Sequence, residues 1–275
     1  MIDSFLSMFS YSFMVRAFIT GIFISVCASM IGVSLVLKHY SMMGDGLSHV
    51  GFGSLALAVV LNQSPLYMSL PIVMLCAFGL LSLSQKSKLQ ADAAIALIST
   101  TALAAGVMIL SLTTGMNTDV CNYLFGSILG MKVSDMYLTV FLCTVIVILY
   151  LVFYPKIFAI TFDETFAKAS GIRVKYYNLA LALMSAVIIT LGMRMMGALL
   201  ISNLLVIPAL SAMRVCKSFK KVVIYSIGIS VFCFIAGLYG SYELSTPTGA
   251  SIVLVNVIVF VLHYLYEKIR EAHAV

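Results

Sequence analysis

The sequence predicts an all-α membrane protein, a polytopic bundle of eight or nine transmembrane helices. Two observations carry this prediction. The chain has 275 residues and is 62% hydrophobic but only 9% charged, with a mean hydropathy of +1.12, whereas a soluble domain carries about 25% charged residues. The apolar residues are also gathered into repeated runs of roughly twenty residues, the length that crosses the hydrocarbon core of a bilayer.

The apolar runs follow one another along the chain and leave no room for a soluble domain or a long linker. Residues 1–275 are therefore expected to form a single transmembrane domain. The first run lacks the basic start and cleavage site of a signal peptide, and we expect it to be retained as a span. The shortest spacing separates the sixth and seventh runs. The expected spans are 14–37, 42–62, 66–84, 92–113, 136–154, 176–193, 195–213, 221–240 and 249–266.

Lysines and arginines cluster in alternate connections between the runs. With nine spans, all four clusters lie on one side of the membrane, which the positive-inside rule makes cytoplasmic, together with the C-terminus. The net charge of +6 reflects these clusters; no aromatic-interleaved basic patch accompanies them, so nucleic acid is not an expected partner. The clusters are Lys86 and Lys88; Lys156, Lys168, Arg173 and Lys175; Arg214, Lys217, Lys220 and Lys221; and Lys268 and Arg270.

One polar constellation falls inside a predicted span, at Gly44-Asp45-Gly46-Leu47-Ser48-His49. Asp45 and His49 are four residues apart, so on a helix they share one face. A carboxylate and an imidazole are suitable ligands for zinc or manganese, and two protein ligands completed by water would let a transported ion leave again. The alternative is an Asp–His contact that only holds helices together. Ionisable residues inside a membrane favour the functional interpretation.

Two connecting segments are unusual. Residues 119–131 are apolar but too short to cross, and we expect an interfacial or re-entrant helix on the outer side, either a cap on the bundle or a gate. Tyr123 and Phe125 in this segment, and Asn203 in the seventh span, are the candidate gate or pore residues.

The second segment, 161–171, lies on the basic side and is predicted to form a two-turn helix. Thr161 and Glu164 have the spacing of a capping box, and Gly171 suits the position just after a helix end. Phe162 and Phe166 would then share one face. Because so short a helix is marginal in water, either its own bundle or a groove on a partner protein must cover these phenylalanines.

The sequence lacks the motifs of common enzymes. It contains no GxxxxGK[ST] phosphate loop, no HExxH and no GxSxG, and its six cysteines form no CxxC pair. We therefore expect a non-catalytic chain, and any ATP hydrolysis would belong to a separate subunit. A secondary transporter working on an ion gradient would need several intramembrane carboxylates and often paired broken helices. Asp45 is the one convincing intramembrane carboxylate.

Taken in order, six short motifs resemble the permease subunits of bacterial ATP-binding-cassette importers for zinc and manganese. The motifs run through almost the whole chain. They are Met43–Val50, Tyr123–Gly126, Thr161–Glu164 continuing through Ala169–Ile172, Met196–Leu200, Leu204–Ala209 and Thr246–Gly249.

The resemblance implies a homodimer in the bacterial plasma membrane with the pore along its twofold axis. It implies two cytoplasmic ATPase copies that bind ATP and Mg, an extracytoplasmic metal-binding protein that delivers the ion, and no cofactor held by this chain. Asp45 and His49 would line the metal path, for zinc slightly ahead of manganese. The segment 161–171 would be the coupling helix that docks into the ATPase, through Phe162, Asp163, Glu164, Phe166, Ala167, Ser170 and Gly171.

Overall fold

The computed structural model describes residues 8–84, 88–113 and 132–272. These residues contain no strand, and nine of their helices are long and apolar enough to cross a membrane. A further helix, α8 (Glu164–Ala169), is a short connector. The nine long helices are α2 (Ser12–Leu37), α3 (Ser41–Val60), α4 (Pro65–Ser84), α5 (Lys88–Thr113), α7 (Val133–Phe162), α9 (Val174–Met196), α10 (Ala198–Val215), α11 (Phe219–Leu244) and α12 (Thr248–Ala272).

The predicted class, a polytopic helical membrane bundle, is confirmed, with nine spans in the described part of the chain. The boundary that differs most is the end of α7, which passes beyond the predicted residue 154 and continues to Phe162. The helix continues through Pro155 and Lys156. A proline inside a helix removes one backbone hydrogen bond but need not stop the helix. The ammonium group of Lys156 lies 5.4 Å from the ring centre of Tyr177, so its charge has a favourable partner near the helix end.

A single residue, Gly197, separates α9 from α10. Its dihedral angles are φ 86° and ψ 160°, a region that is open essentially to glycine alone. The backbone N–H of Gly197 donates to the carbonyl of Met193 and closes the last turn of α9. The short spacing between the sixth and seventh apolar runs therefore marks a helical hairpin with a one-residue turn.

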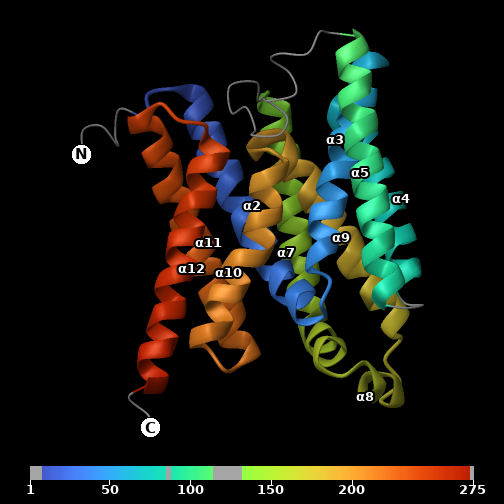
Figure 1. Cartoon of the computed structure of the whole chain (residues 1–275), viewed down its shortest axis with the longest axis vertical. Coiled ribbons are helices and arrows are strands. Elements are labelled where there is room, and N and C mark those ends of the chain that lie inside the picture. The colour runs from blue at the N-terminus through green and yellow to red at the C-terminus, as the bar shows by residue number, and fades with distance from the viewer. Residues whose placement is uncertain (1–7, 85–87, 114–131, 273–275) are drawn as a thin grey trace.

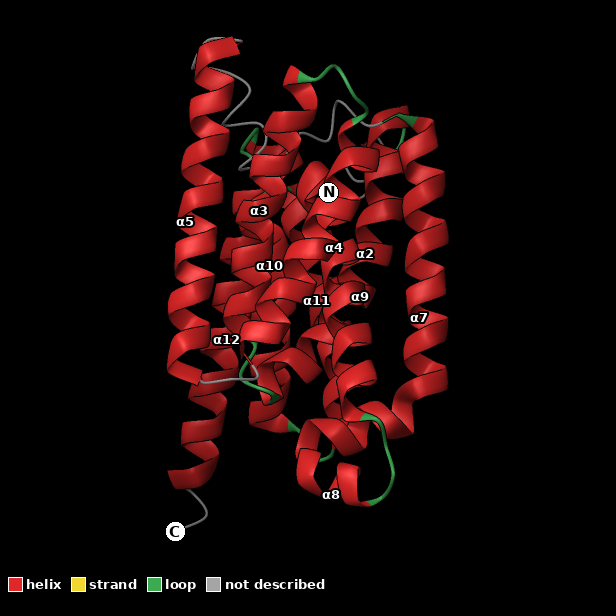
Figure 2. Ribbon diagram, turned by 90° about the vertical axis from the view of Figure 1, so that its right-hand side faces the viewer, coloured by secondary structure: helices red, strands yellow, loops and turns green. Residues whose placement is uncertain are grey.

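The helices are arranged around α2 and α9 (Figure 1). The central helix α2 packs against α7, α9, α10 and α11, while α3 packs against α4, α5, α9 and α10. Helix α12 packs on α10 and α11, and α5 and α7 lie at opposite edges of the bundle (Figure 2). The most enclosed spans are α2, α3 and α9, and the least enclosed are α5, α7 and α12.

The two ends of the bundle differ in charge. One end carries α8, the α2–α3 turn and the end of α12, and the start of α2 lies at the other end (Figure 1). Of the lysines and arginines whose side chains are described, only Arg16, Lys132 and Arg194 lie at the end opposite α8. The three basic clusters whose side chains are described are thus brought to the same end, as the nine-span interpretation requires.

Glycines set several of the helix crossings. A Cβ atom added at Gly53 would lie 2.7 Å from the carbonyl oxygen of Ala102, so α3 and α5 touch backbone to backbone there. A Cβ atom at Gly32 would overlap the carbonyl group of Leu205 where α2 crosses α10. Such close approach lets helices associate in a lipid environment, where apolar surfaces alone provide little attraction.

A pair of glycine substitutions tests this packing. Gly32→Ala is expected to lower the thermal unfolding midpoint in detergent, because separating α2 from α10 costs about 1–3 kcal/mol. The control is Gly228→Ala in α11, where an added Cβ meets no atom within 4 Å. That change should be neutral or stabilising by about 1 kcal/mol, the helix-propensity gain of alanine. Equal midpoints for the two variants would show that the α2–α10 crossing does not depend on the missing side chain.

Candidate metal path and coupling helix

Asp45 and His49 lie one turn apart near the start of α3 and face each other. The Nε2 atom of His49 is 3.7 Å from Oδ2 of Asp45. That distance is an electrostatic contact, longer than a good hydrogen bond. Both groups therefore keep the capacity to bind a further partner. With a rise of about 1.5 Å per residue, they lie roughly 6 and 12 Å into the helix, within the half of the membrane nearer α8.

The exposure of this pair indicates what lies beside it. The side chain of Asp45 is 54% exposed and that of His49 is 20% exposed in the single chain. A carboxylate that faces hydrocarbon costs about 2.5–3.5 kcal/mol or more at the centre of a membrane and less at the shallower depth of Asp45, but it remains unfavourable there. This face of α3 is therefore better suited to water or another protein surface than to lipid tails.

Two buried polar atoms near this region have no hydrogen-bond partner within the described residues. They are Nδ1 of His49 and the side-chain oxygen Oδ1 of Asn203. Asn203 belongs to α10, which packs against α3. Buried polar groups normally form hydrogen bonds. Each of these two atoms could therefore bind a water molecule, an ion or a group from another chain. Ser48, between Asp45 and His49, is satisfied by donating to the Asp45 carbonyl at 2.7 Å.

The described part of one chain does not hold a closed metal cage. Among its residues, no group of three or more His, Cys, Asp or Glu side chains is placed to hold a metal ion. Asp45 and His49 thus offer at most an open two-ligand set, and water or a second chain would have to complete the coordination. The predicted gate residues Tyr123 and Phe125 lie outside the described residues.

The segment 161–171 differs from the predicted capping box. Thr161 and Phe162 still belong to α7, and the side-chain hydroxyl of Thr161 donates back to the carbonyl of Ile157 at 2.7 Å. The chain breaks at Asp163, whose carboxylate accepts from the backbone N–H groups of Thr165 and Phe166 at 2.8 and 2.9 Å. Asp163 is therefore the N-cap of α8, and the assignment of Thr161 was wrong. Asp and Thr are both good N-cap residues, so the local pattern alone did not separate them.

The end of α8 agrees with the prediction for Gly171. The N–H of Gly171 donates to the carbonyl of Lys168, and the N–H of Ile172 donates to that of Ala167, both at 3.0 Å. This is a Schellman motif, and Gly171 has the positive φ of 80° that the motif requires. The helix is thereby fixed at both ends, although it is only six residues long.

The two phenylalanines do not share a face of one helix, contrary to prediction. Phe162 ends α7 and its ring packs against those of Phe158 and Phe219, with centres 5.0 and 5.8 Å apart. Phe166 lies on α8 and is 66% exposed, whereas Ala167 beside it is buried. Phe162 is also 60% exposed, but its ring has aromatic neighbours on α7 and α11, whereas Phe166 projects from α8 at the end of the molecule.

A buried lysine that the sequence did not single out contacts α8. The ammonium group of Lys38 lies 2.6 Å from the Glu164 carboxylate and 2.6 Å from Oδ1 of Asn178. Burial opposes ionisation of Glu164, but hydrogen bonds from Lys38 and Asn178 and the nearby lysine charges outweigh it, so the pKa of Glu164 is held below its ordinary value. The predicted role of Glu164 in capping is thus replaced by a long-range ion pair.

At the opposite end, Arg194 forms an ion pair with Asp135. The guanidinium of Arg194, in the last turn of α9, lies 3.0 Å from Oδ1 of Asp135 in the first turn of α7. Asp135 also accepts from the backbone N–H of Lys132. Arg194 therefore ties α9 to α7 at this end of the bundle.

The described residues thus form a bundle with nine candidate spans, a polar pair on α3 and a short helix at the basic end, an architecture suited to a membrane transport protein. The sequence matches the ABC 3 transport family over residues 10–267. The chain belongs to this family, and it is a membrane permease of the manganese and zinc importer class.

Individual relatives match over nearly their whole length. The manganese transport system membrane protein MntC of Listeria monocytogenes is 27% identical over 256 residues, which cover 93% of this chain and 91% of the relative. The high-affinity zinc uptake system membrane protein ZnuB of Haemophilus influenzae is 29% identical over 255 residues, 92% and 97% of the two chains. The solved structure of PsaBC from Streptococcus pneumoniae in complex with Fab superposes with a TM-score of 0.86 at 28% identity, covering 96% and 95%.

Proposed function

We propose that this chain is the pore-lining subunit of an ATP-driven importer of divalent first-row metal ions. Two copies would form the pore along a twofold axis, and a separate cytoplasmic ATPase dimer would hydrolyse ATP. An extracytoplasmic metal-binding protein would deliver the ion. In this arrangement the end that carries α8 and the end of α12 is cytoplasmic, in keeping with its excess of lysine and arginine.

The observation that carries the proposal is the exposed face of α3 with Asp45 and His49. A partly exposed carboxylate beside an imidazole, on a helix that is otherwise well enclosed, is unfavourable against lipid but suits a hydrated ion path. The twofold axis would bring the same pair from a second copy to the opposite wall of the pore. Each chain would then contribute two ligands, with water completing the coordination of an ion in transit.

The projecting Phe166 supports docking of an ATPase at α8. An aromatic side chain that is two-thirds exposed beyond the end of a bundle is favoured if a partner's apolar groove covers it. Movement of the docked ATPases would then shift α8 and rock the two bundles between outward-open and inward-open arrangements, as in other transporters that work by alternating access.

Zinc is the favoured cargo, with manganese the second candidate. Aspartate and histidine bind both ions, and the relatives include proteins named for manganese as well as one named for zinc. Geometry at a two-ligand site does not discriminate strongly, so the delivery protein would contribute much of the selectivity.

The experiment that tests the function is uptake into proteoliposomes. The chain is reconstituted with its ATPase and delivery protein, and uptake of radiolabelled zinc and manganese is followed with and without ATP. We expect uptake to require ATP, the ATPase and the delivery protein. Uptake by the permease alone along a proton or sodium gradient would instead establish the alternative, a secondary transporter, and would overturn the proposal.

A further inference from the structure

Lys38 occupies an unusual place, because it is a buried cation at the junction of four helices. It caps the end of α2, and its side chain is only 4% exposed. Its ammonium group donates to Oε1 of Glu164 on α8, to Oδ1 of Asn178 on α9, and to the carbonyl of Ile160 in α7 at 3.2 Å. A lysine ammonium has three donors, and all three are used.

The acceptors are also joined to one another. The Nδ2 group of Asn178 donates to the same Oε1 atom of Glu164 at 3.0 Å, which closes a triangle with Lys38. Asn178 is buried, whereas Glu164 is 38% exposed at the edge of α8. The network therefore begins at the surface beside the projecting Phe166 and ends at a buried ammonium group on the α2–α3 turn.

The turn that follows Lys38 is closed by two backbone hydrogen bonds. His39 has a positive φ of 59°, its N–H donates to the carbonyl of Val36, and the N–H of Tyr40 donates to that of Leu35 at 2.8 Å. This is a second Schellman motif, with histidine in the place that glycine usually takes. Helix α3 begins directly afterwards at Ser41. No loop lies between Lys38 and Asp45, so a displacement of Lys38 is expected to move the start of α3.

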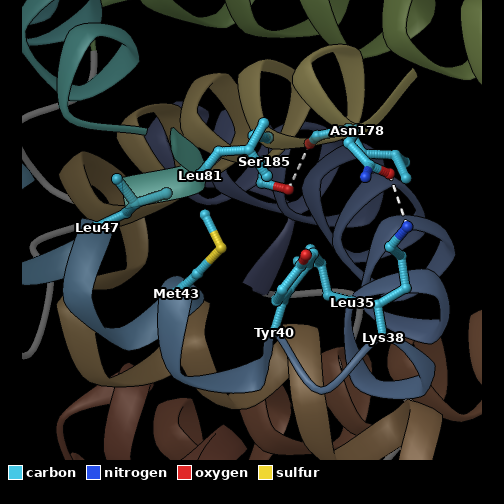
Figure 3. Close-up of a pocket in the computed structure, with 11 residues that line it drawn as sticks. Leu35, Lys38, Tyr40, Met43, Leu47, Leu81, Asn178 and Ser185 are labelled. Atoms are coloured by element: carbon cyan, nitrogen blue, oxygen red, sulfur yellow. Dashed lines mark hydrogen bonds between the residues drawn. The ribbon is translucent and has the colours of Figure 1, made fainter. Parts of the chain in front are cut away.

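The first turns of α3 border a small cavity. Met43 and Leu47 line it on one side, and Asn178 and Ser185 of α9 line it on the other (Figure 3). Gly44 also lines it. Its volume of about 10 Å³ gives room for about one water molecule. Figure 3 also shows the Lys38 side chain reaching to Asn178 at the rim of this space. The start of α3 is thus held to α9 through Lys38, beside a gap in the packing.

We propose that Lys38, with Glu164 and Asn178, is the link that transmits movement of α8 to the start of α3 and so to the Asp45–His49 pair. This inference rests on the proposed function. Lys38 is a positioning residue, since it acts through α3 and does not touch the ion. The same contacts fix the resting geometry of the pair when α8 is not displaced.

The test uses the complete complex of permease, ATPase and delivery protein in proteoliposomes. Glu164→Gln keeps the shape of the link and removes one charge. The double variant Lys38→Met with Glu164→Gln removes both charges, which avoids leaving a buried ammonium without a counter-charge. Lys175→Met and Glu271→Gln are the matched controls, since both residues are exposed and outside the network. Copurification of the ATPase, the rate of ATP hydrolysis and the rate of zinc uptake are measured on the same preparations.

The resemblance placed Glu164 in the docking segment, but its carboxylate accepts from Lys38 and Asn178 inside the permease. We therefore expect both variants to retain the ATPase and to hydrolyse ATP within about twofold of the wild-type rate, while the number of ions moved per ATP falls at least fivefold. The controls should keep the wild-type ratio. An unchanged ratio in the double variant would overturn the inference. So would loss of the folded complex or of ATPase binding in both variants, because the network would then serve assembly. Failure of the proposed function is distinguishable, since the wild-type complex would then show no ATP-dependent uptake.

Discussion

Metal uptake is expected to fall by more than about tenfold when Asp45 is replaced by asparagine or His49 by glutamine. Both changes keep the size of the side chain. If the pair binds the ion as proposed, asparagine removes the negative charge that would offset a divalent cation, and glutamine removes the imidazole that would bind it. Loss of a group that only supports a metal ligand already costs about 10- to 100-fold in affinity or activity. Loss of a direct ligand should cost at least as much.

The measurement is ATP-dependent zinc uptake in proteoliposomes, with assembly of the complex checked by size-exclusion chromatography. His263→Gln is the matched control for the histidine, since His263 lies in α12 and its ring contacts Tyr225. Glu271→Gln at the end of α12 is the control for the carboxylate. Normal uptake by both Asp45→Asn and His49→Gln, with normal assembly, would make the pair a structural contact between neighbouring turns of α3.

The second large effect is expected at Phe166. Phe166→Asp should leave the bundle folded, because the side chain is mostly exposed, but should prevent the ATPase from copurifying and abolish uptake. A buried aromatic anchor at a protein interface contributes about 2 kcal/mol or more, which corresponds to at least about a 30-fold loss of affinity. A charged residue in the same groove would also have to be desolvated, which adds to the loss.

Tyr266→Asp is the control for this change, because Tyr266 is 55% exposed near the same end of the bundle but lies on α12. It should bind the ATPase normally. If the Phe166→Asp variant retains ATPase and transports metal at the wild-type rate, α8 is not the docking element. Thermal unfolding of both variants without the ATPase separates a docking defect from a folding defect.

The spans were predictable because their signal is long and local. A run of about twenty apolar residues has few interpretations other than a membrane span. The one-residue turn at Gly197 corresponds to the short gap between the sixth and seventh runs. The shared face of Asp45 and His49 followed from helical spacing alone. Their exposure did not, since it depends on which of the neighbouring helices cover α3.

The contacts of Lys38 with Glu164 and Asn178 could not be predicted from the sequence, for a different reason. Its partners Glu164 and Asn178 lie 126 and 140 residues away along the chain, and one sequence carries no signal that joins such distant positions. The N-cap of α8 was missed because two adequate caps stand two residues apart. The rings of Phe158 and Phe162 contact Phe219 of α11. These contacts stabilise the last turns of α7, so the helix ends at Phe162 and Asp163 follows it.

The one-residue turn at Gly197 limits how the bundle can rearrange. Only two Cα–Cα steps of about 3.8 Å join Met196 to Ala198, so the end of α9 and the start of α10 stay within about 7 Å of each other. The two helices can tilt about this point, but neither can move far along its axis without the other. Asn178 lies on α9 and Asn203 on α10, so we expect a displacement at the end that carries α8 to reach both helices together, as a tilt about Gly197.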